Sequence, residues 1–527
     1  MRHLTCRHAL LLTSAVVILA TLPAAAQTSV ALTESVARFA PEVQVLGEAD
    51  AANWLHFQVA LRLRNGAALA ASNAARVHLS SDDLDRKYLP ARADHDAVVG
   101  WLRGQGLTIE TTDTSRLTIG VSGSAGNVAR AFGVHFSRIV SESQNFIAAD
   151  SVPAIPIALA GAVLSINGLQ PHLHAHKMNI VHPFSNTAVP YYAGAFVKAY
   201  GATGIGNDGA NTTTAIVIDT FPKTTDLTKY WSTAGIPQSL SNITIIQTVP
   251  GKLPAISGEE SMDAQIASSV APASKVRVYA SKSLGYANLD TAFQKVVTDL
   301  QAGVVITQVS ISLGGCETST PAGEIATDDN FFSVMSSLGA TVFVSSGDSG
   351  SHECGGTANV PSFFSTSPNV TAVGGTTLKL TTTGTTKTET SWTGSGGGIS
   401  QKFTKPAYQS ALSYAMRAVP DISTDANPST GALVYVNGAA QQIGGTSLSA
   451  PMSAGLAALV NSSRLAAGKP TLGQLNSRLY PLLGTANFRD IKTGSNGGYS
   501  ASAGFDLVTG IGSPAMATLL PTLVAQP

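Results

Sequence analysis

A serine in a glycine-rich turn is the first residue of this sequence that could do chemistry. Ser447 lies in GGTSLSAPMSAGLAALV (444–460), where a Gly-Gly-Thr turn leads directly into an apolar run. This arrangement would present a nucleophilic serine at the start of a buried helix. Because a serine hydroxyl is a poor nucleophile at its own pKa, it needs a base to take its proton. The nature of that base decides which reaction the sequence predicts.

Histidine, the usual base for a catalytic serine, is scarce in the second half of the chain. Of the 11 histidines, only His352 follows residue 182. It lies in the glycine-rich loop SGDSGSHECGG, where we expect a solvated side chain rather than an oriented base. An esterase-type hydrolase that uses His352 is the rival hypothesis. Ser349 in the same loop resembles the nucleophile of chymotrypsin-like proteases, but the surrounding α/β pattern excludes their all-β fold.

Two carboxylates offer another base. In ISGEESMDAQIASSVAP, Glu259 precedes Asp263 by one helical turn, so both side chains lie on one face of a predicted helix. Two close acids titrate as a pair with one apparent pKa raised, and such a pair accepts a proton only while partly ionised. We therefore expect activity in the acid range. The alternative is a solvated acidic helix face, and Glu260 is the fallback partner of Asp263.

A third acid ends a predicted strand. Asp348 follows the run TVFVSS (341–346). A tetrahedral acyl-transfer intermediate needs a hydrogen-bond donor for its oxyanion, and a protonated aspartic acid can supply one. The alternative is an ordinary turn aspartate that caps the next element.

The pattern of elements divides the chain into three parts. From about residue 191, short β-rich runs alternate with helix-like segments, which predicts a parallel sheet covered by helices on both faces. Residues 27–170 also alternate strands and helices, so we predict a small α/β domain. The stretch 171–190, PHLHAHKMNIVHPFSNTAVP, has no periodicity and is interpreted as a linker.

The N-terminus and the cysteines indicate export. Basic residues precede the apolar stretch ALLLTSAVVILATLPAAAQ, which predicts a signal peptide over 1–26 rather than a membrane anchor. Two cysteines, Cys316 and Cys354, remain after its removal, and in an exported protein they favour one disulfide over two free thiols. Acidic and basic residues balance at 32 each, so nothing favours nucleic acid or a membrane surface as a partner.

Together these residues resemble the sedolisin family of serine-carboxyl peptidases, of the pro-kumamolisin type. The resemblance implies a subtilisin-like catalytic domain over 191–527, with Ser447 as nucleophile, Glu259 as its base, Asp263 orienting that base and Asp348 as oxyanion donor. It also implies that residues 27–170 form a ferredoxin-like activation prodomain. The linker, 171–190, would then contain the maturation cleavage site.

The resemblance further implies one structural calcium ion near the C-terminus. The stretch FRDIKTGSNGGYSASAGFDLVTGIGSP (488–514) is similar to the calcium loop of the family. The implied ligands are two carboxylates and three main-chain carbonyls, from Asp490, Ile491, Ser502, Gly504 and Asp506, a mixture that suits calcium. The alternative is a glycine-rich turn with two unrelated acids. Two positions depart from the family pattern: Ser502, where glycine is more frequent, and Leu313, where several relatives carry tryptophan.

The sequence thus predicts an exported zymogen of an acid-acting serine endopeptidase that processes itself. We expect a monomer, secreted to the periplasm or outside the cell, with protein or peptide substrates and its own prodomain as intramolecular inhibitor. A tripeptidyl exopeptidase is the nearest variant, and a catalytically silent binding protein is the rival from another class. The linker histidines, at 172, 174, 176 and 182, lead to the hypothesis that their protonation below about pH 6.5 loosens the prodomain.

Overall fold

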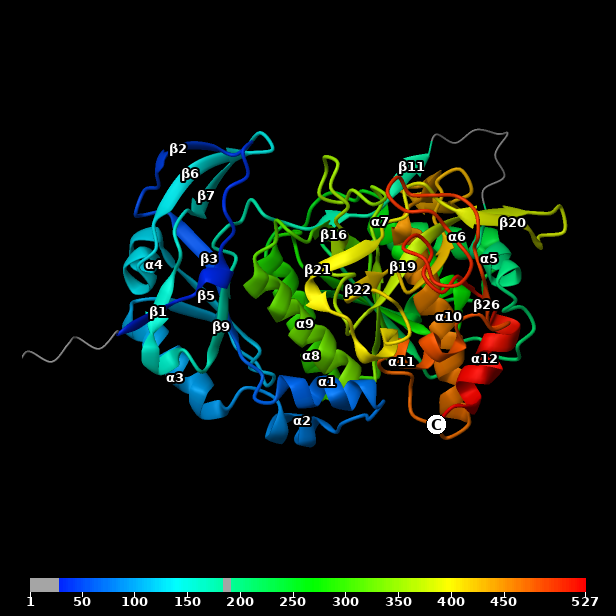
Figure 1. Cartoon of the computed structure of the whole chain (residues 1–527), viewed down its shortest axis with the longest axis horizontal. Helices are drawn as coiled ribbons and strands as arrows, with labels where there is room; N and C mark the ends of the chain where they lie inside the picture. Colours follow the sequence, from blue (N-terminus) through cyan, green and yellow to red (C-terminus); the bar gives the residue numbers. More distant parts are fainter. Residues whose placement is uncertain (1–27, 183–190) are drawn as a thin grey trace, which may run out of the picture.

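The computed structural model describes residues 28–182 and 191–527 and forms two bodies joined by an extended segment (Figure 1). The predicted signal peptide and the last eight residues of the predicted linker, 183–190, lie outside the described residues. One hydrophobic core lies within the smaller, N-terminal body, and a larger core fills the second body.

The smaller body is built on a four-stranded antiparallel sheet in the order β4-β5-β3-β9. The strands are β3 (Trp54–Leu61), β4 (Thr108–Thr111), β5 (Thr118–Ser124) and β9 (Val163–Asn167). Helices α3 (Arg92–Gly104) and α4 (Ala125–Phe132) pack on this sheet. The strand order and the two crossing helices are those of a ferredoxin-like fold, so this prediction is confirmed.

Shorter strands complete the smaller body. They are β1 (Ser29–Ala31), paired with β8 (Ala154–Pro156), and the three-stranded sheet of β2 (Gln44–Glu48), β6 (Phe136–Ser141) and β7 (Gln144–Ala149).

Local sequence sets both ends of helix α4. The Ser124 hydroxyl accepts a hydrogen bond from the Asn127 backbone N–H at 3.2 Å, which satisfies one free donor of the first turn. Gly133 ends the helix with a φ of 62°, a left-handed conformation that glycine adopts at little cost. The run SAGNVARAFG therefore contains both the residue that starts this helix and the residue that ends it.

The larger body contains a mainly parallel sheet in the order β13-β14-β12-β15-β17-β19-β20, with β23 also paired to β19. Its strands are β12 (Thr213–Ile218), β13 (Ile243–Gln247), β14 (Lys275–Ala280), β15 (Gln308–Ile311), β17 (Thr341–Ser345), β19 (Thr371–Leu380), β20 (Thr386–Ser391) and β23 (Ile422–Asp425). All six residues of β12 are buried, as expected for a strand covered on both faces.

Helices cover both faces of this sheet. On one face α7 (Glu259–Val270) packs against α10 (Thr446–Ala466), and both contact the central strands. On the other face α8 (Tyr286–Gln301) and α9 (Ala322–Ser337) pack against each other and against the sheet. This arrangement confirms the predicted α/β fold class.

The smaller body docks on α8 and α9 (Figure 1). Strands β3 and β5 contact α8, and β9 contacts α9. Helix α1 (Gly66–Ala74) also lies on α9, where Asn73 donates a hydrogen bond to the Ser333 carbonyl at 2.9 Å. The N-terminal body therefore covers the helices on one face of the large sheet.

The described part of the predicted linker contains two short strands. It forms β10 (His176–Lys177), which pairs antiparallel with β16 (Leu313–Cys316), and β11 (Ile180–His182), which pairs antiparallel with β25 (Ala439–Gly444). These partner strands belong to the large body, more than a hundred residues away in sequence. Strands of two or three residues are too short to show a periodic pattern, so they could not be recognised from the sequence.

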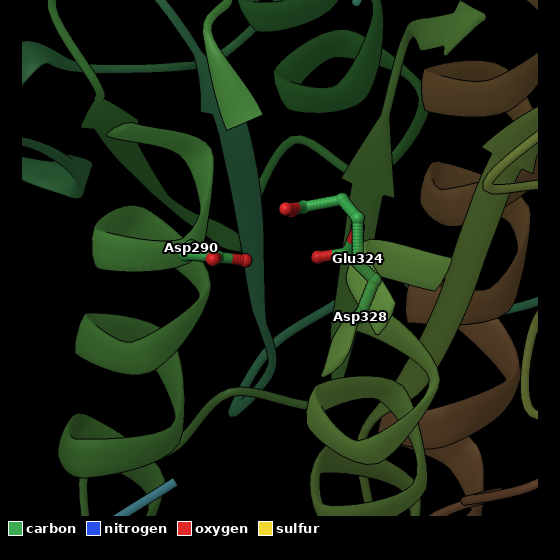
Figure 2. A group of neighbouring side chains, drawn as sticks. All are labelled: Asp290, Glu324 and Asp328. Carbon is green, nitrogen blue, oxygen red and sulfur yellow. The ribbon is translucent and has the colours of Figure 1, made fainter. Parts of the chain in front are cut away.

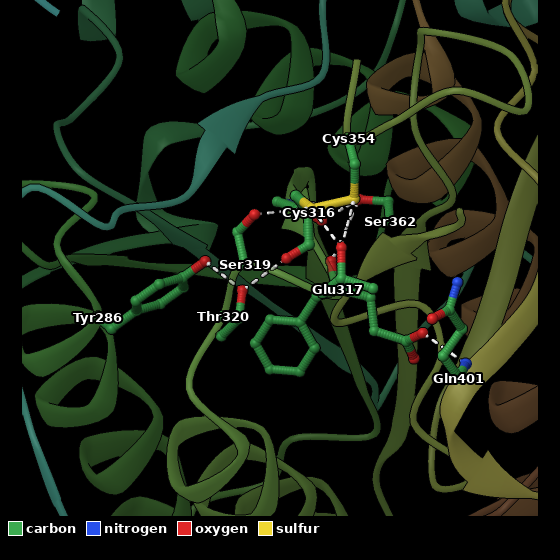
Figure 3. The surroundings of a disulfide bond; sticks show 11 residues. Tyr286, Cys316, Glu317, Ser319, Thr320, Cys354, Ser362 and Gln401 are labelled. Carbon is green, nitrogen blue, oxygen red and sulfur yellow. Dashed lines mark hydrogen bonds between the residues drawn. A yellow bond between two sulfur atoms is a disulfide. The ribbon is translucent and has the colours of Figure 1, made fainter. Parts of the chain in front are cut away.

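A disulfide joins Cys316, at the end of β16, to Cys354 in the glycine-rich loop that follows β17 (Figure 3). The favoured pairing of the two cysteines is therefore confirmed. Beside it, Glu317 accepts hydrogen bonds from the Ser400 hydroxyl and the Gln401 backbone N–H. Within the described residues, no helix is long and apolar enough to cross a bilayer.

Candidate active site

Ser447 lies in the first turn of α10 and is fully buried. Gly445 precedes the helix with a φ of 107°, and a Cβ on it would lie 2.4 Å from Asp348 Oδ2 and 2.5 Å from the Met178 carbonyl oxygen. Only glycine fits this close approach. The Ser447 backbone N–H donates to the Met178 carbonyl at 2.9 Å, and its hydroxyl donates to the Ser312 carbonyl at 3.2 Å.

Glu259 and Asp263 lie one turn apart at the start of α7, and both are fully buried. The alternative of a solvated acidic face is therefore wrong. The Ser312 hydroxyl donates to Asp263 Oδ1 at 2.7 Å. Within the described residues, Asp263 Oδ2 and both carboxyl oxygens of Glu259 have no hydrogen-bond partner. Ser312 thus contacts both Asp263 and Ser447, and the serine and the acid pair belong to one buried cluster.

Burial dominates the electrostatics of this pair. It raises the pKa of Glu259 well above the usual range, and the charge of Asp263 raises this pKa further, while the nearby Ser447 hydroxyl acts in the opposite direction. Burial also raises the pKa of Asp263, against the lowering effect of the Ser312 hydrogen bond. The pair therefore holds a proton more tightly than two exposed acids would.

Glu260 points to a different place. Its Oε1 accepts hydrogen bonds from the backbone N–H groups of Ser257 and Gly258, at 3.0 and 2.9 Å. Its Oε2 lies 3.5 Å from the Lys177 ammonium, which also contacts Asp219 Oδ1 at 2.7 Å. Glu260 therefore belongs to an acidic pocket with Asp219 and contacts the linker.

Asp348 follows β17 and is half-buried against the start of α10. Its Oδ1 accepts hydrogen bonds from the Thr446 backbone N–H at 2.7 Å and from the Thr446 hydroxyl at 2.9 Å. Among the described residues, its Oδ2 has no partner, and it borders the same space as the Met178 carbonyl. Burial raises the pKa of Asp348 to about 7. The carboxyl is thus arranged to accept at one oxygen and to carry a proton at the other.

His352 takes no part in this cluster. It contacts the Ser351 hydroxyl at 3.1 Å and lies beside Gly497, whereas the polar contacts of Ser447 are with Ser312 and Met178. In the described part of the chain, no hydrogen bond joins a histidine to Ser447. This geometry does not support the esterase hypothesis.

Ser312 and Asp219 have polar roles here that the sequence analysis did not assign. Asp219 follows β12, Ser312 follows β15 and Asp348 follows β17, and these three strands are neighbours in the parallel sheet. Their carboxyl ends meet at one edge, the usual position of a site in such sheets. A polar residue directly after each buried run was the signal that could have identified them.

The predicted calcium ligands lie in one loop region after β26 (Phe488–Arg489). Asp490 Oδ2 accepts a hydrogen bond from the Gly504 N–H at 3.1 Å, and Asp506 Oδ2 accepts one from the Ser502 N–H at 3.0 Å. Asp490 Oδ1 is buried with no partner among the described residues. An unpartnered carboxylate oxygen within a set of hard oxygen donors fits calcium.

A second group of acids lies under the smaller body. Asp290 of α8 faces Glu324 and Asp328 of α9, and all three are buried (Figure 2). Asn167 of β9 donates to Asp290 Oδ2 at 3.1 Å. Burial raises the pKa of Asp290 to about 7 and, with the neighbouring acids, raises the other two well above their usual range. These carboxyls could bind a cation or be neutral acids at the interface.

Several known proteins resemble this chain. The family described as "Pro-kumamolisin, activation domain" matches residues 41–171. Sedolisin of Pseudomonas sp. (strain 101) is 33% identical over 90% of this chain and 87% of its own length. Kumamolisin of Bacillus sp. (strain MN-32) is 31% identical over 85% of this chain and 86% of its own length. The solved structure of Pseudomonas sedolisin (serine-carboxyl proteinase), complexed with two molecules of pseudo-iodotyrostatin, has a TM-score of 0.57 at 32% identity. It covers 64% of this chain and 98% of that chain.

The fold, the buried serine and these relatives define a serine-type peptidase with an N-terminal activation domain. Within that class, the chain belongs to the sedolisin family of serine-carboxyl peptidases.

The acid group in Figure 2 leads to a prediction about pH. Because burial raises the pKa of Asp290 to about 7, the folded precursor binds a proton there that the unfolded chain releases above about pH 4. The stabilisation is therefore present at low pH and is lost as pH rises toward 7. Asp290→Asn, which is neutral at every pH, should raise the free energy of unfolding by about 1–3 kcal/mol near pH 7.5 and change it little near pH 4.

Urea unfolding of the precursor at both pH values, with Ser447→Ala present to prevent proteolysis, measures this difference. Asp96→Asn, at a largely exposed carboxyl of α3, is the matched control and should change stability little at either pH. A loss of stability near neutral pH in Asp290→Asn would contradict the prediction and would indicate that the acid group holds a cation.

Proposed function

We propose that the protein is the exported precursor of an acid-acting serine-carboxyl endopeptidase. Its predicted parts are a signal peptide (1–26), a prodomain (27–170), a linker (171–190) and a catalytic domain (191–527). The observation that carries the proposal is the buried cluster in which Ser312 contacts both Ser447 and Asp263. At the same place the Ser447 N–H binds a backbone carbonyl, that of Met178. The disulfide supports export, because such bonds persist in oxidising compartments.

In the proposed reaction the Ser447 oxygen attacks the carbonyl carbon of the substrate, and Glu259 accepts the hydroxyl proton. Asp263 shares the remaining proton of the acid pair and orients Glu259. The backbone N–H of Ser447 and the protonated Asp348 donate hydrogen bonds to the oxyanion. Glu259 then gives its proton to the leaving amine, and water hydrolyses the acyl-enzyme by the same steps.

Two opposite proton requirements make this chemistry acidic. Asp348 donates only while protonated, so activity should fall as pH rises through its pKa of about 7. The acid pair accepts a proton only while partly ionised, so activity should also fall when both members are protonated at low pH. Removal of the linker would admit water to the cleft and lower the pKa of the pair, because desolvation is the main cause of the raised values.

Purified precursor, acidified and followed by mass over time, tests the proposal. We expect wild type to lose its prodomain, whereas Ser447→Ala and Glu259→Gln should remain intact, because removal of a catalytic serine or its base typically costs about 10⁴-fold or more. Processing that persists in Ser447→Ala would overturn the proposal. Hydrolysis of peptides with blocked N-termini should accompany maturation, and a requirement for a free N-terminus would instead indicate tripeptidyl cleavage.

The oxyanion role of Asp348 is tested by an amide. Asn can accept from Thr446 at Oδ1 and donate at the position of Oδ2 at every pH. Asp348→Ala should lower kcat by about 10²–10³, whereas Asp348→Asn should keep more activity and lose the alkaline decline near pH 7. The measurement is the pH dependence of kcat/KM.

Glu353 provides the matched control. It is a half-buried acid in the same loop that accepts a hydrogen bond from the Ser349 N–H at 2.7 Å, and partial burial raises its pKa to about 8. Glu353→Gln should leave the alkaline decline in place. An unaltered decline in Asp348→Asn would contradict the role assigned to Asp348.

We also propose one structural calcium ion, held by the carboxylates of Asp490 and Asp506 and the carbonyls of Ile491, Ser502 and Gly504. A bound ion would neutralise the two carboxylates and fix the C-terminal loop. In the Ser447→Ala precursor, millimolar Ca²⁺ should raise the thermal midpoint by about 5 °C, and Asp490→Asn should remove most of this rise. A rise that persists in Asp490→Asn but disappears in Glu324→Gln would assign the ion to the acid group of Figure 2.

A further inference from the structure

The segment 175–182 of the precursor crosses the candidate active site in an extended conformation. On one side of the site β10 pairs with β16, with His176 opposite Gly314 and Lys177 opposite Leu313. On the other side β11 pairs with β25, with Ile180 opposite Gly444. Extended peptides bind proteins in this way, through main-chain hydrogen bonds to an available strand. The two residues between the paired strands, Met178 and Asn179, lie at Ser447.

The hydrogen bonds identify one peptide bond at the nucleophile. The Met178 N–H donates to the Ser312 carbonyl at 3.2 Å, the same carbonyl that accepts from the Ser447 hydroxyl. The Met178 carbonyl accepts from the Ser447 N–H at 2.9 Å. This carbonyl oxygen and the unpartnered Oδ2 of Asp348 both lie within 2.5 Å of the position that a Cβ on Gly445 would take. The Met178 carbonyl therefore lies where the Ser447 oxygen would attack a substrate carbonyl.

The Met178 side chain fills a narrow pocket. It is 6% exposed, and a Cβ on Gly314 would lie 2.3 Å from its terminal methyl carbon and 2.2 Å from the Ser362 hydroxyl oxygen. The absence of a side chain at Gly314 thus makes room for the end of a long, unbranched residue. Methionine suits such a pocket, because its three rotatable bonds adapt to irregular space.

Lys177, one residue earlier, binds an acidic pocket. Its ammonium lies 2.7 Å from Asp219 Oδ1, 2.8 Å from the Ser257 hydroxyl and 3.5 Å from Glu260 Oε2, and its side chain is only 14% exposed. The backbone N–H groups of Ser257 and Gly258 hold Glu260 in place. A buried ammonium group needs such acidic partners. When the linker departs, Asp219 and Glu260 lose the cation that they bind.

We propose that Met178–Asn179 is the first bond that the precursor cleaves in itself. We also propose that Asp219 and Glu260 select lysine or arginine at the position of Lys177, the second residue on the N-terminal side of the cleaved bond. This inference rests on the proposed function. Ser447 forms an ester with the Met178 carbonyl carbon, the C–N bond to Asn179 breaks, and the Asn179 nitrogen takes the proton. Water then releases Met178 as a carboxylate. Preferred substrates are peptides with a basic residue followed by a long unbranched apolar one.

Acidified precursor, stopped at early times and examined by mass and N-terminal sequencing, tests the bond. We expect the first products to end at Met178 and to begin at Asn179. Lys177→Glu should slow this cleavage roughly tenfold to hundredfold, because it sets a third acid against the pocket. Lys177→Arg should process nearly as wild type does, and Lys177→Gln should lie between.

Mature wild-type enzyme and peptides of residues 173–182, LHAHKMNIVH, test the pocket separately from folding of the precursor. We expect kcat/KM to be highest for the peptide with Lys at position 177, lower with Gln and lowest with Glu. In the Asp219→Asn enzyme, the difference in kcat/KM between the Lys and Gln peptides should be smaller. An equal rate for Lys and Glu peptides, or a first cleavage at another bond that still depends on Ser447, overturns this inference and leaves the proposed function standing. Processing that does not depend on Ser447 overturns both.

Discussion

The burial of two carboxyls one helical turn apart beside a serine is the constraint on which the rest of the site depends. Glu259 and Asp263 lie in a body whose only described histidine, His352, makes no hydrogen bond to Ser447. Desolvation is costly for two like charges, so the pair retains a proton and carries at most one charge over much of the pH range. This cost is tolerable because α7 packs on α10 and because the Ser312 hydroxyl stabilises the charged form of Asp263.

The interface of the two bodies contains groups that respond to acid in opposite directions. Burial in the folded precursor favours the protonated forms of Asp290, Glu324 and Asp328, so the free energy of unfolding rises as pH falls. His172, buried in the linker, and His78, half-buried against the large body, have their pKa values lowered to about 4, mainly by desolvation. The stability of the precursor that depends on these neutral histidines is present above the ordinary histidine pKa of about 6.5. It is lost as pH falls toward 4, because the unfolded chain then binds protons that the folded precursor does not. Weakening by acid therefore comes from these two histidines, at lower pH than the linker hypothesis assumed for His172.

The residues that could be predicted from sequence stand in local patterns. The turn before Ser447, the helical spacing of Glu259 and Asp263 and the strand before Asp348 can each be recognised within about a dozen residues, and continuous apolar strands indicate a parallel sheet. The acidic pocket could not be predicted, because Asp219, Glu260 and Lys177 meet only through tertiary contacts. The linker strands could not be predicted either, because their partners β16 and β25 lie far along the chain.

The same contacts that present the linker to the nucleophile also hold it in the cleft. A cut after Met178 would leave β10 joined to the prodomain, which still covers α8 and α9, so the N-terminal product would stay bound through both surfaces. Cleavage and release are then separate events with separate proton requirements. Cleavage needs a protonated Asp348, whereas release needs the loss of interface contacts, which protonation of His78 and His172 favours and the acid group of Asp290 opposes. Because the histidines require lower pH than Asp348 does, a cut precursor that retains its prodomain is the expected intermediate between the two events.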